Sequence, residues 1–193
     1  MNKKFNFGAK LDFSKIDLTP PNLVIEEILS GLPDETNQII RGKIIPYTGP
    51  VFSYTQKGLS GIAAALGTGD KEVDIQEDLG SINGEAHKFE CFLYTPEYEK
   101  YKYRLFFVRY GISHYPVSVV LEESISRSIP NGNTGYVLKC NNRGQLEDLM
   151  YSIFNSKRLI AIMQELIRID QAKKAEKMFS ETENVDCGES EEN

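Results

Sequence analysis

The stretch from Tyr101 to Glu123, YKYRLFFVRYGISHYPVSVVLEE, holds the side chains of this chain that are best suited to acid–base chemistry. His114 follows a predicted turn between two strands, and an imidazole that titrates near neutral pH can act as a general base. Tyr115 is next to it, and Glu122 is a carboxylate near the end of the second strand that can orient an imidazole. The catalytic candidates are therefore His114, Tyr115 and Glu122, as in a hydrolase or a nuclease. Because nothing in the sequence shows that they meet, we favour a half-exposed histidine at a hairpin end.

Residues 58–71, GLSGIAAALGTGDK, resemble a phosphate-binding loop without matching it. Such a loop needs the pattern G-x-x-x-x-G-K-[ST], in which backbone amides hold the phosphates and the hydroxyl holds magnesium. Gly61 and Gly67 are one residue too far apart for this pattern, and Lys71 is followed by a glutamate. The sequence therefore argues against a bound nucleotide. The apolar residues of this insertion favour a packed flap or a loop that binds a partner: Leu59, Ile62 and Leu66.

The spacing of cysteine and histidine residues gives no metal site. Cys91, Cys140 and Cys187 are far apart in the sequence and include no C-x-x-C pair. His87 and Cys91 share one face of a predicted strand, but the strand separates them by roughly 13 Å, too far to bind one ion together. No strand is followed by the E-x-K signature of restriction-type nucleases. We therefore expect no metal ion and no cofactor, and a thiol nucleophile would have to reach His114 through the fold.

The acidity of the chain is confined to its C-terminal end. The net charge is −6, and the last 13 positions hold six acidic residues and no Lys or Arg. The other 22 acidic residues are balanced by 22 basic ones, so the body has no general attraction for a phosphate backbone. Nucleic acid is therefore not an expected partner. One alternative stays open, because the aromatic and basic side chains of YKYRLFFVRY can stack on single-stranded bases. It requires that strand pairing build a basic stripe from Lys43, Lys102, Arg104 and Arg109.

The sequence predicts a protein of the cytoplasm. No apolar run approaches the roughly 18 residues that span a bilayer. The N-terminus, MNKKFNFGAKLDFSKID, lacks the apolar region of a secretory signal. Cysteines that form no disulfide framework fit a reducing compartment. We therefore expect no association with a membrane.

Hydrophobic periodicity predicts an α+β fold. A helix over 20–32, with Thr19 as its cap, places Ile25, Ile28 and Leu29 on one face. The order of helix, consecutive strands and helices favours a mainly antiparallel sheet of four to six strands, flanked by one N-terminal and two C-terminal helices. The predicted strands cover 36–47, 51–55, 71–77, 87–94, 101–110, 116–123 and 136–140. The predicted C-terminal helices cover 141–156, capped by Asn141 or Asn142, and 156–179, capped by Ser156.

The chain is expected to form one domain over residues 19–179, with the glycine-rich insertion at about 56–80. Residues 1–18 are expected to be flexible or to add an edge strand, and 180–193 to be a disordered acidic tail. At the centre of the domain, Leu105–Val108 are apolar on both faces of their strand. We therefore expect this strand to be covered from both sides.

The last predicted helix carries a hydrophobic face that is wider than one packing surface needs. A stripe begins at Leu159, and Ile160, Met163 and Ile167 widen it. A face this broad either packs inside the fold or meets a second chain. These three widening residues are therefore candidate binding residues for a protein partner or for a second copy of the chain.

The chain contains PPNLVIEEIL, TNQIIRGKI, YKYRLFFV, HYPVSVVLE and LEDLMYSIFNSKRLI, which are spread over residues 20–160. In this order the segments resemble a family of uncharacterised bacterial proteins. The shared features are a helix that starts at P-x-x-I/L, a strand near T-N, a Y-x-Y-R-L strand, a Y-P-V strand and a closing helix. The resemblance implies the same order of helix, strands and helices, and it implies no activity and no site residues.

Since no catalytic signature is present, the sequence favours a non-enzymatic protein-binding or regulatory domain of the cytoplasm. Two alternatives remain. One is a hydrolase or nuclease with its site near His114, and the other is a single-stranded nucleic-acid binder.

Overall fold

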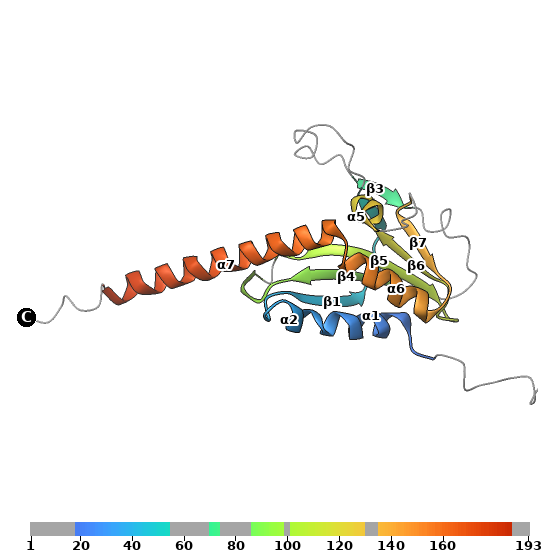
Figure 1. The fold of residues 1–193 in the computed structure, drawn as a ribbon, viewed down its shortest axis with the longest axis horizontal. Coiled ribbons are helices and arrows are strands. Elements are labelled where there is room, and N and C mark those ends of the chain that lie inside the picture. The colour runs from blue at the N-terminus through green and yellow to red at the C-terminus, as the bar shows by residue number, and fades with distance from the viewer. Residues whose placement is uncertain (1–17, 55–69, 74–85, 99–100, 130–134, 187–193) are drawn as a thin grey trace, which may run out of the picture.

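The structure is a computed structural model that describes residues 18–54, 70–73, 86–98, 101–129 and 135–186 (Figure 1). Its centre is a five-stranded antiparallel sheet in the order β1–β4–β5–β6–β7. These strands are β1 (Arg41–Pro46), β4 (Ala86–Tyr94), β5 (Tyr103–Gly111), β6 (Val117–Leu121) and β7 (Val137–Cys140). A separate pair is formed by β2 (Val51–Tyr54) and β3 (Asp70–Val73). The helices are α1 (Pro21–Ser30), α2 (Leu32–Glu35), η2 (Pro96–Tyr98), α5 (Glu123–Ser128), α6 (Arg143–Phe154) and α7 (Lys157–Asp186).

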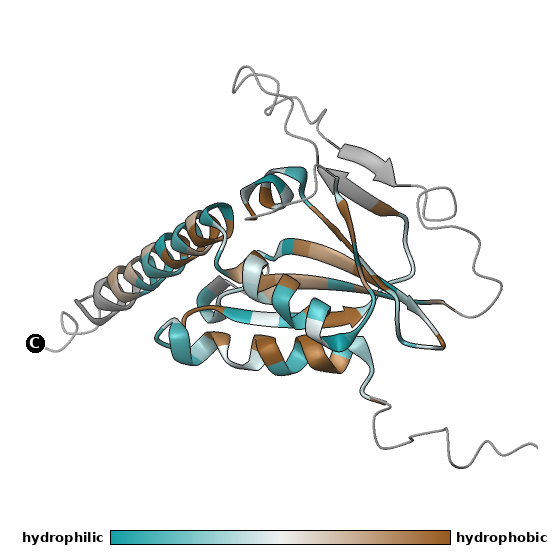
Figure 2. Cartoon of the chain, turned by 45° about the vertical axis from the view of Figure 1, so that its right-hand side comes forward, coloured by the Kyte–Doolittle hydropathy of each residue, from teal (hydrophilic) through white to brown (hydrophobic). Residues whose placement is uncertain are grey.

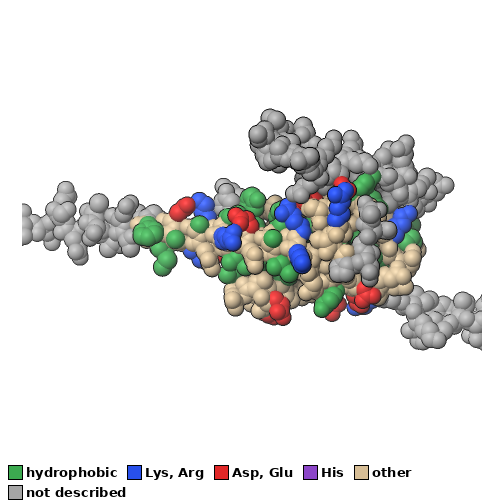
Figure 3. All heavy atoms as spheres, turned by 45° about the horizontal axis from the view of Figure 1, so that its top comes forward, with side chains coloured by type: hydrophobic (Ala, Val, Ile, Leu, Met, Phe, Trp, Pro, Cys, Tyr) green, Lys and Arg blue, Asp and Glu red, His purple; other side chains and the backbone are tan. Residues whose placement is uncertain are grey.

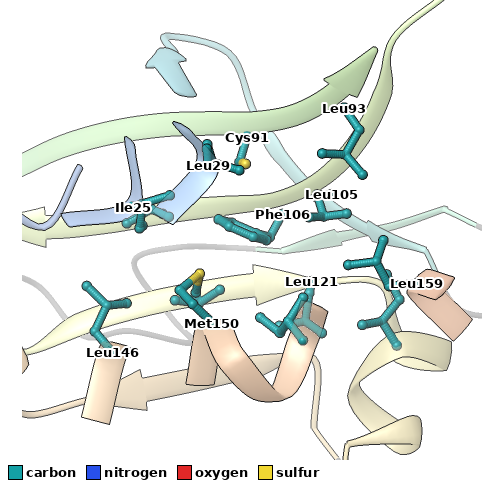
Figure 4. Packing of buried hydrophobic residues seen from close by; sticks show 14 of the residues in the cluster. Ile25, Leu29, Cys91, Leu93, Leu105, Phe106, Leu121, Leu146, Met150 and Leu159 are labelled. Atoms are coloured by element: carbon teal, nitrogen blue, oxygen red, sulfur yellow. The ribbon is translucent and has the colours of Figure 1, made fainter. Parts of the chain in front are cut away.

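The predicted α+β class is confirmed, with an antiparallel sheet, one N-terminal helix and two C-terminal helices. Helix α1 packs against both β1 and α6. Figure 4 shows the main core, where side chains of α1 and α6 meet those of the central strands. Its largest fully buried members include Ile25, Leu93, Phe106, Met150 and Leu159.

Helix α1 approaches β1 closely because Gly42 has no side chain. A Cβ atom at this position would lie 2.5 Å from Leu29 Cδ2 and 3.2 Å from Leu29 Cβ. The cap position of α1 is Pro20, so the prediction of Thr19 as the cap is wrong. Pro21 occupies the first helical position, where its missing N–H leaves no hydrogen bond unmade.

A β-bulge in β5 changes which side chains face the helices. Cys91 of β4 pairs with Phe106, but Phe92 pairs with Arg104, so Leu105 has no opposite residue in β4. Leu105 and Phe106 both belong to the main core and are at most 2% exposed. Arg104 is thereby placed on the face of the sheet that points away from α1 and α6.

This second face of the sheet is covered near its centre by β2. Phe107 and Val120 pack with Val51, and the ring of Tyr47 lies 4.9 Å from that of Phe107. All four residues of Leu105–Val108 are at most 3% exposed. The prediction that this strand is covered from both sides is therefore confirmed. Figure 2 shows hydrophobic residues along the central strands and a mixture of hydrophobic and hydrophilic residues along the helices.

Helix α5 was not predicted. The strand expected over 116–123 ends at Leu121, and Glu122 is the cap residue of α5. The carbonyl of Glu122 accepts hydrogen bonds from the backbone N–H groups of Ile125 and Ser126, so the chain turns into a helix where an unbroken strand was expected. Tertiary packing decides this switch, because Ile125 is fully buried in the main core.

The two C-terminal helices begin where the sequence predicts. Asn142 Oδ1 accepts a hydrogen bond of 2.9 Å from the Gln145 N–H, and Ser156 Oγ accepts one of 3.2 Å from the Leu159 N–H. Helix α7 continues to Asp186, past the expected end at 179 and into the expected tail, while 187–193 lie outside the described residues. Residues 1–17 and most of 56–80 also lie outside them.

Helix α7 extends away from the sheet at its C-terminal end (Figure 1). Its middle is held to the body by Asp170, whose side chain is fully buried. Asp170 Oδ1 accepts a hydrogen bond of 3.2 Å from the Glu97 N–H in η2, and Oδ2 lies 3.1 Å from Lys174 Nζ. Across the ranges that the structure describes, no helix combines the length and the apolar character needed to cross a membrane.

Candidate functional site

His114 and Glu122 lie at opposite ends of β6. The five residues of this strand separate them, and a strand of that length spans about 17 Å. His114 is half-buried at the end of the hairpin, with its ring edge-on to that of Tyr110 at 6.0 Å between centroids. Tyr115 packs against the main core. The three catalytic candidates therefore do not converge on one reacting atom, as a hydrolase or nuclease site would require.

Glu122 holds a structural junction between β5, α5 and α7. Its carboxylate is 9% exposed and accepts hydrogen bonds from Tyr103 Oη, at 2.6 Å, and from Ser124 Oγ. Arg158 Nη2 lies 3.6 Å from the same group. Burial raises the pKa of Tyr103 above its ordinary value of 10.0, and the hydrogen bond to Glu122 raises it further. The phenol therefore stays protonated and acts as a donor, and the Glu122 carboxylate is already engaged.

A cavity of about 560 Å³ lies next to this junction. Its charged groups are paired or stacked: Arg104 Nε lies 2.9 Å from Glu90 Oε2, and Lys102 Nζ lies 4.7 Å from the centre of the Phe92 ring. Among the described residues that line it there is no histidine or cysteine. In the part of the chain that the structure describes, no group of three or more His, Cys, Asp or Glu residues is arranged to hold a metal ion.

The two cysteines that the structure describes are poor nucleophiles. Cys91 and Cys140 are free and buried in the main core. Burial raises the pKa of Cys140 to about 11, from an ordinary value of 9.0, and raises that of Cys91 further. Both side chains are therefore protonated at neutral pH, and the reactive species of a cysteine nucleophile is the thiolate.

The candidate binding residues of the C-terminal helix are only partly available. Ile160 is 41% exposed, whereas Met163 and Ile167 are half-buried and pack against the main core. The sequence predicts one binding role for these three residues, but in the fold only Ile160 is exposed. The other candidate binding residues, Leu59, Ile62 and Leu66, lie outside the described residues.

Strand pairing places several basic residues on the second face of the sheet. Lys43 lies opposite Phe92, and Phe92 lies opposite Arg104, so these three side chains form one row across three strands. Arg109, opposite Lys88, belongs to the same face. The basic character is interrupted, because Glu90 shares this face and pairs with Arg104. Figure 3 likewise shows basic and acidic side chains interspersed on the side of the molecule where α7 lies.

An open groove of about 640 Å³ runs between α1 and α6 and was not predicted. Its floor is apolar and includes Val24, Ile28 and Leu32, which follow each other at four-residue intervals on one side of α1–α2. The far side is formed by Phe154 and by Tyr151, which is 73% exposed. The carboxylates that frame the groove come from α1, α2 and α6: Glu27, Glu35, Glu147 and Asp148.

One arginine closes a salt bridge across this groove. Arg143 of α6 places Nε 2.6 Å from Glu147 Oε1 and Nη2 3.7 Å from Glu27 Oε2 of α1. The side chains of all three residues are more than a third exposed, so the pairs are worth only a fraction of a kcal/mol each. With four carboxylates and one guanidinium, the groove carries a formal excess of negative charge.

Gly31 leaves a gap in the wall of the groove. It lies between Glu27 and Glu35 at four-residue spacing, with a φ of −80°. A Cβ atom built on it would meet only the Ile28 carbonyl oxygen, at 3.6 Å, which is an ordinary contact. A Cβ atom therefore fits here without strain in the backbone. In the sequence, the groove is indicated only by the four-residue spacing of residues along α1 and α2, such as Val24, Ile28 and Leu32. The groove itself forms only when α6 packs against α1.

A scan against protein-family models finds no family that matches this chain, and no curated protein or solved structure is significantly similar to it. Geometry is therefore the basis for a functional assignment.

Proposed function

We propose that this protein is a non-enzymatic protein-binding domain of the cytoplasm, and that its docking site is the groove between α1 and α6. The observation that carries this proposal is a recess of about 640 Å³ with an apolar lining, framed by carboxylates of α1, α2 and α6. Val24 is buried at its base, and Ile28 and Leu32 are half-buried. An occupant would therefore contact chiefly the latter two side chains and the exposed ring of Tyr151. The separation of His114 from Glu122 supports binding over catalysis. The two buried free thiols support a reducing compartment.

Burial does not separate the two surfaces, because Met163 and Ile167 of α7 pack against the main core in the same way as Ile28 and Leu32 of the groove. The C-terminal helix is the weaker docking surface because it offers a partly exposed Ile160, whereas the groove is a recess of about 640 Å³. A second copy bound through α7 would leave the α1–α6 groove open. The proposal therefore places the partner in the groove, and a self-association through α7 is an alternative outcome of the same experiment.

Photo-crosslinking tests this function. A photoreactive side chain replaces Tyr151, which is exposed at the edge of the groove, and the full chain is irradiated in its host cells. The matched control carries the same group at Lys139, which is exposed in β7. We expect one discrete protein adduct from position 151 and none of the same mass from position 139. Equal adducts from both positions, or none from position 151, would contradict a docking role for the groove.

Single-stranded nucleic acid is a second candidate ligand. The observation that favours it is the row of Lys43, Phe92 and Arg104 across three strands, since alternating cations and rings suit a phosphate backbone with stacked bases. Against it stand the neutral charge of the body and the pairing of Arg104 with Glu90.

Fluorescence anisotropy with a labelled oligothymidine of about 20 nucleotides decides between the two at moderate salt. A nucleic-acid binder would bind it and would lose affinity in the Lys43→Glu, Lys102→Glu double variant. The protein-binding proposal expects no saturable binding and no effect of this variant.

A further inference from the structure

We propose that the occupant of the α1–α6 groove is a basic amphipathic α-helix from a partner protein. This inference rests on the proposed function, and it adds the chemical class of the partner. The shape of the groove is the first argument. Two rows of side chains at four-residue spacing line it: Val24, Ile28 and Leu32 along α1 and the start of α2, with Val24 buried at the base, and Arg143, Glu147 and Tyr151 on α6. Rows of this spacing accept the matching rows of a third helix.

The groove has the length of a short helix. Val24 to Leu32 spans about 12 Å and Arg143 to Phe154 about 16 Å, at 1.5 Å per residue. An occupant of roughly three turns therefore fills it. Gly31 is the widest point of the α1 wall, because Glu27 and Glu35 flank a position without a side chain. A large apolar residue of the occupant would enter there, above Ile28.

Backbone hydrogen bonding favours a helix over an extended peptide. The walls are helices, whose own N–H and C=O groups are bonded within each helix, so they offer few partners to a peptide backbone. An extended occupant would bury unpaired backbone groups, whereas a helix arrives with them already bonded. A strand would instead be expected at the edge of the sheet.

Charge selects the polar residues of the occupant. Glu27, Glu35, Glu147 and Asp148 surround the apolar floor, and Arg143 is the one basic residue among the described residues that line it. Lysines or arginines on both flanks of the apolar stripe would lie beside these carboxylates. The same carboxylates disfavour a nucleic acid and an anionic membrane surface as ligands, because both carry negative charge.

Two synthetic peptides test this inference. The basic probe is a capped peptide of about 18 residues, with leucines on one helical stripe and lysines on the flanks. The matched probe replaces each lysine by glutamate. Isothermal titration with the full chain is expected to give saturable binding of the basic probe, weakened by added salt. The acidic probe is expected to bind at least about tenfold more weakly.

Gly31→Leu is the decisive variant, because Gly31 lines the groove and a Cβ atom there meets only an ordinary contact, so the larger side chain is expected to occupy part of the groove. We expect this variant to fold normally and to bind the basic probe at least about tenfold more weakly. A double charge reversal, Glu35→Lys with Asp148→Lys, is expected to weaken it similarly. The control is Glu165→Lys, a charge reversal on exposed α7 outside the groove, which should leave binding unchanged.

Equal affinity for the two probes, or unchanged binding to Gly31→Leu, would overturn the inference. So would sedimentation showing a dimer of the full chain that Gly31→Leu dissociates, because the occupant would then be a second copy. The proposed function fails separately, through the crosslinking experiment. If position 151 captures a protein through an acidic or non-helical segment, the function stands and the basic helix does not.

Discussion

At the scale of single residues, a carboxylate that looks catalytic in the sequence has a structural role. Glu122 accepts hydrogen bonds from Tyr103 and Ser124 and lies beside Arg158, so it ties β5 to α5 and α7. Side-chain type alone cannot distinguish such a tether from a catalytic carboxylate. A structural carboxylate differs from a catalytic one in that its oxygen atoms already accept hydrogen bonds from the protein.

Removal of the Tyr103 hydroxyl tests this assignment. Tyr103→Phe leaves a buried carboxylate oxygen without its donor, so we expect a loss of about 1–3 kcal/mol in the free energy of unfolding. Urea denaturation measures it, with Tyr151→Phe as a control at an exposed ring that is expected to change little. An unchanged midpoint for Tyr103→Phe would show that the hydrogen bond does not hold the junction.

Buried thiols make stability depend on pH at the alkaline end. Burial raises the folded pKa of Cys140 to about 11 from 9.0. The contribution of this protonated thiol to the free energy of unfolding is therefore complete below pH 9 and is lost as the pH rises toward 11. In that window the unfolded chain releases a proton that the folded chain keeps. Stability should fall by up to about 1.4 kcal/mol per pH unit for this thiol.

The Cys140→Ala variant isolates that contribution. Urea denaturation at pH 8, 9 and 10 under reducing conditions should show a shallower loss of stability in this variant than in the wild type. Parallel curves for the two proteins would mean that Cys140 ionises in the folded state as readily as in the unfolded chain.

At the scale of elements, the close contact of α1 with β1 depends on a glycine. A Cβ at Gly42 would lie 2.5 Å from Leu29 Cδ2. We expect Gly42→Ala to lower the free energy of unfolding by about 1–3 kcal/mol, because the helix must shift. The matched variant is Gly31→Ala, which meets only an ordinary contact and should be neutral or stabilising by up to about 1 kcal/mol. Equal effects at the two glycines would contradict the packing described for α1.

Periodicity predicted most of these elements because it reports which faces are buried. The strands around Leu105–Val108, the stripe of α6 and the caps Asn142 and Ser156 were all readable from residue type and spacing. The bulge at Leu105 was not, since it depends on pairing with β4. Helix α5 was missed because Glu122 and its neighbours continue a strand-like pattern until the packing of Ile125 is known.

At the scale of the whole molecule, acidic side chains gather at the groove although the body is formally neutral. Carboxylates from α1, α2 and α6 frame the groove, and a row with Lys43 and Arg104 lies on the other face of the sheet. A net charge counted from the sequence cannot show this arrangement. The α1–α6 groove was invisible for the same reason, because its two walls are more than 100 positions apart in the chain.

The most direct test of the docking role compares crosslinking from position 151 in two backgrounds, in cells that express the full chain. One chain is otherwise wild type and the other carries Gly31→Leu. Both chains should be equally abundant, since a Cβ atom at position 31 meets only an ordinary contact. If the partner binds in the groove, the first background should give a discrete protein adduct, and the yield of this adduct should fall by about tenfold or more in the second. Adducts of equal yield in both backgrounds would show that the partner, if there is one, binds elsewhere.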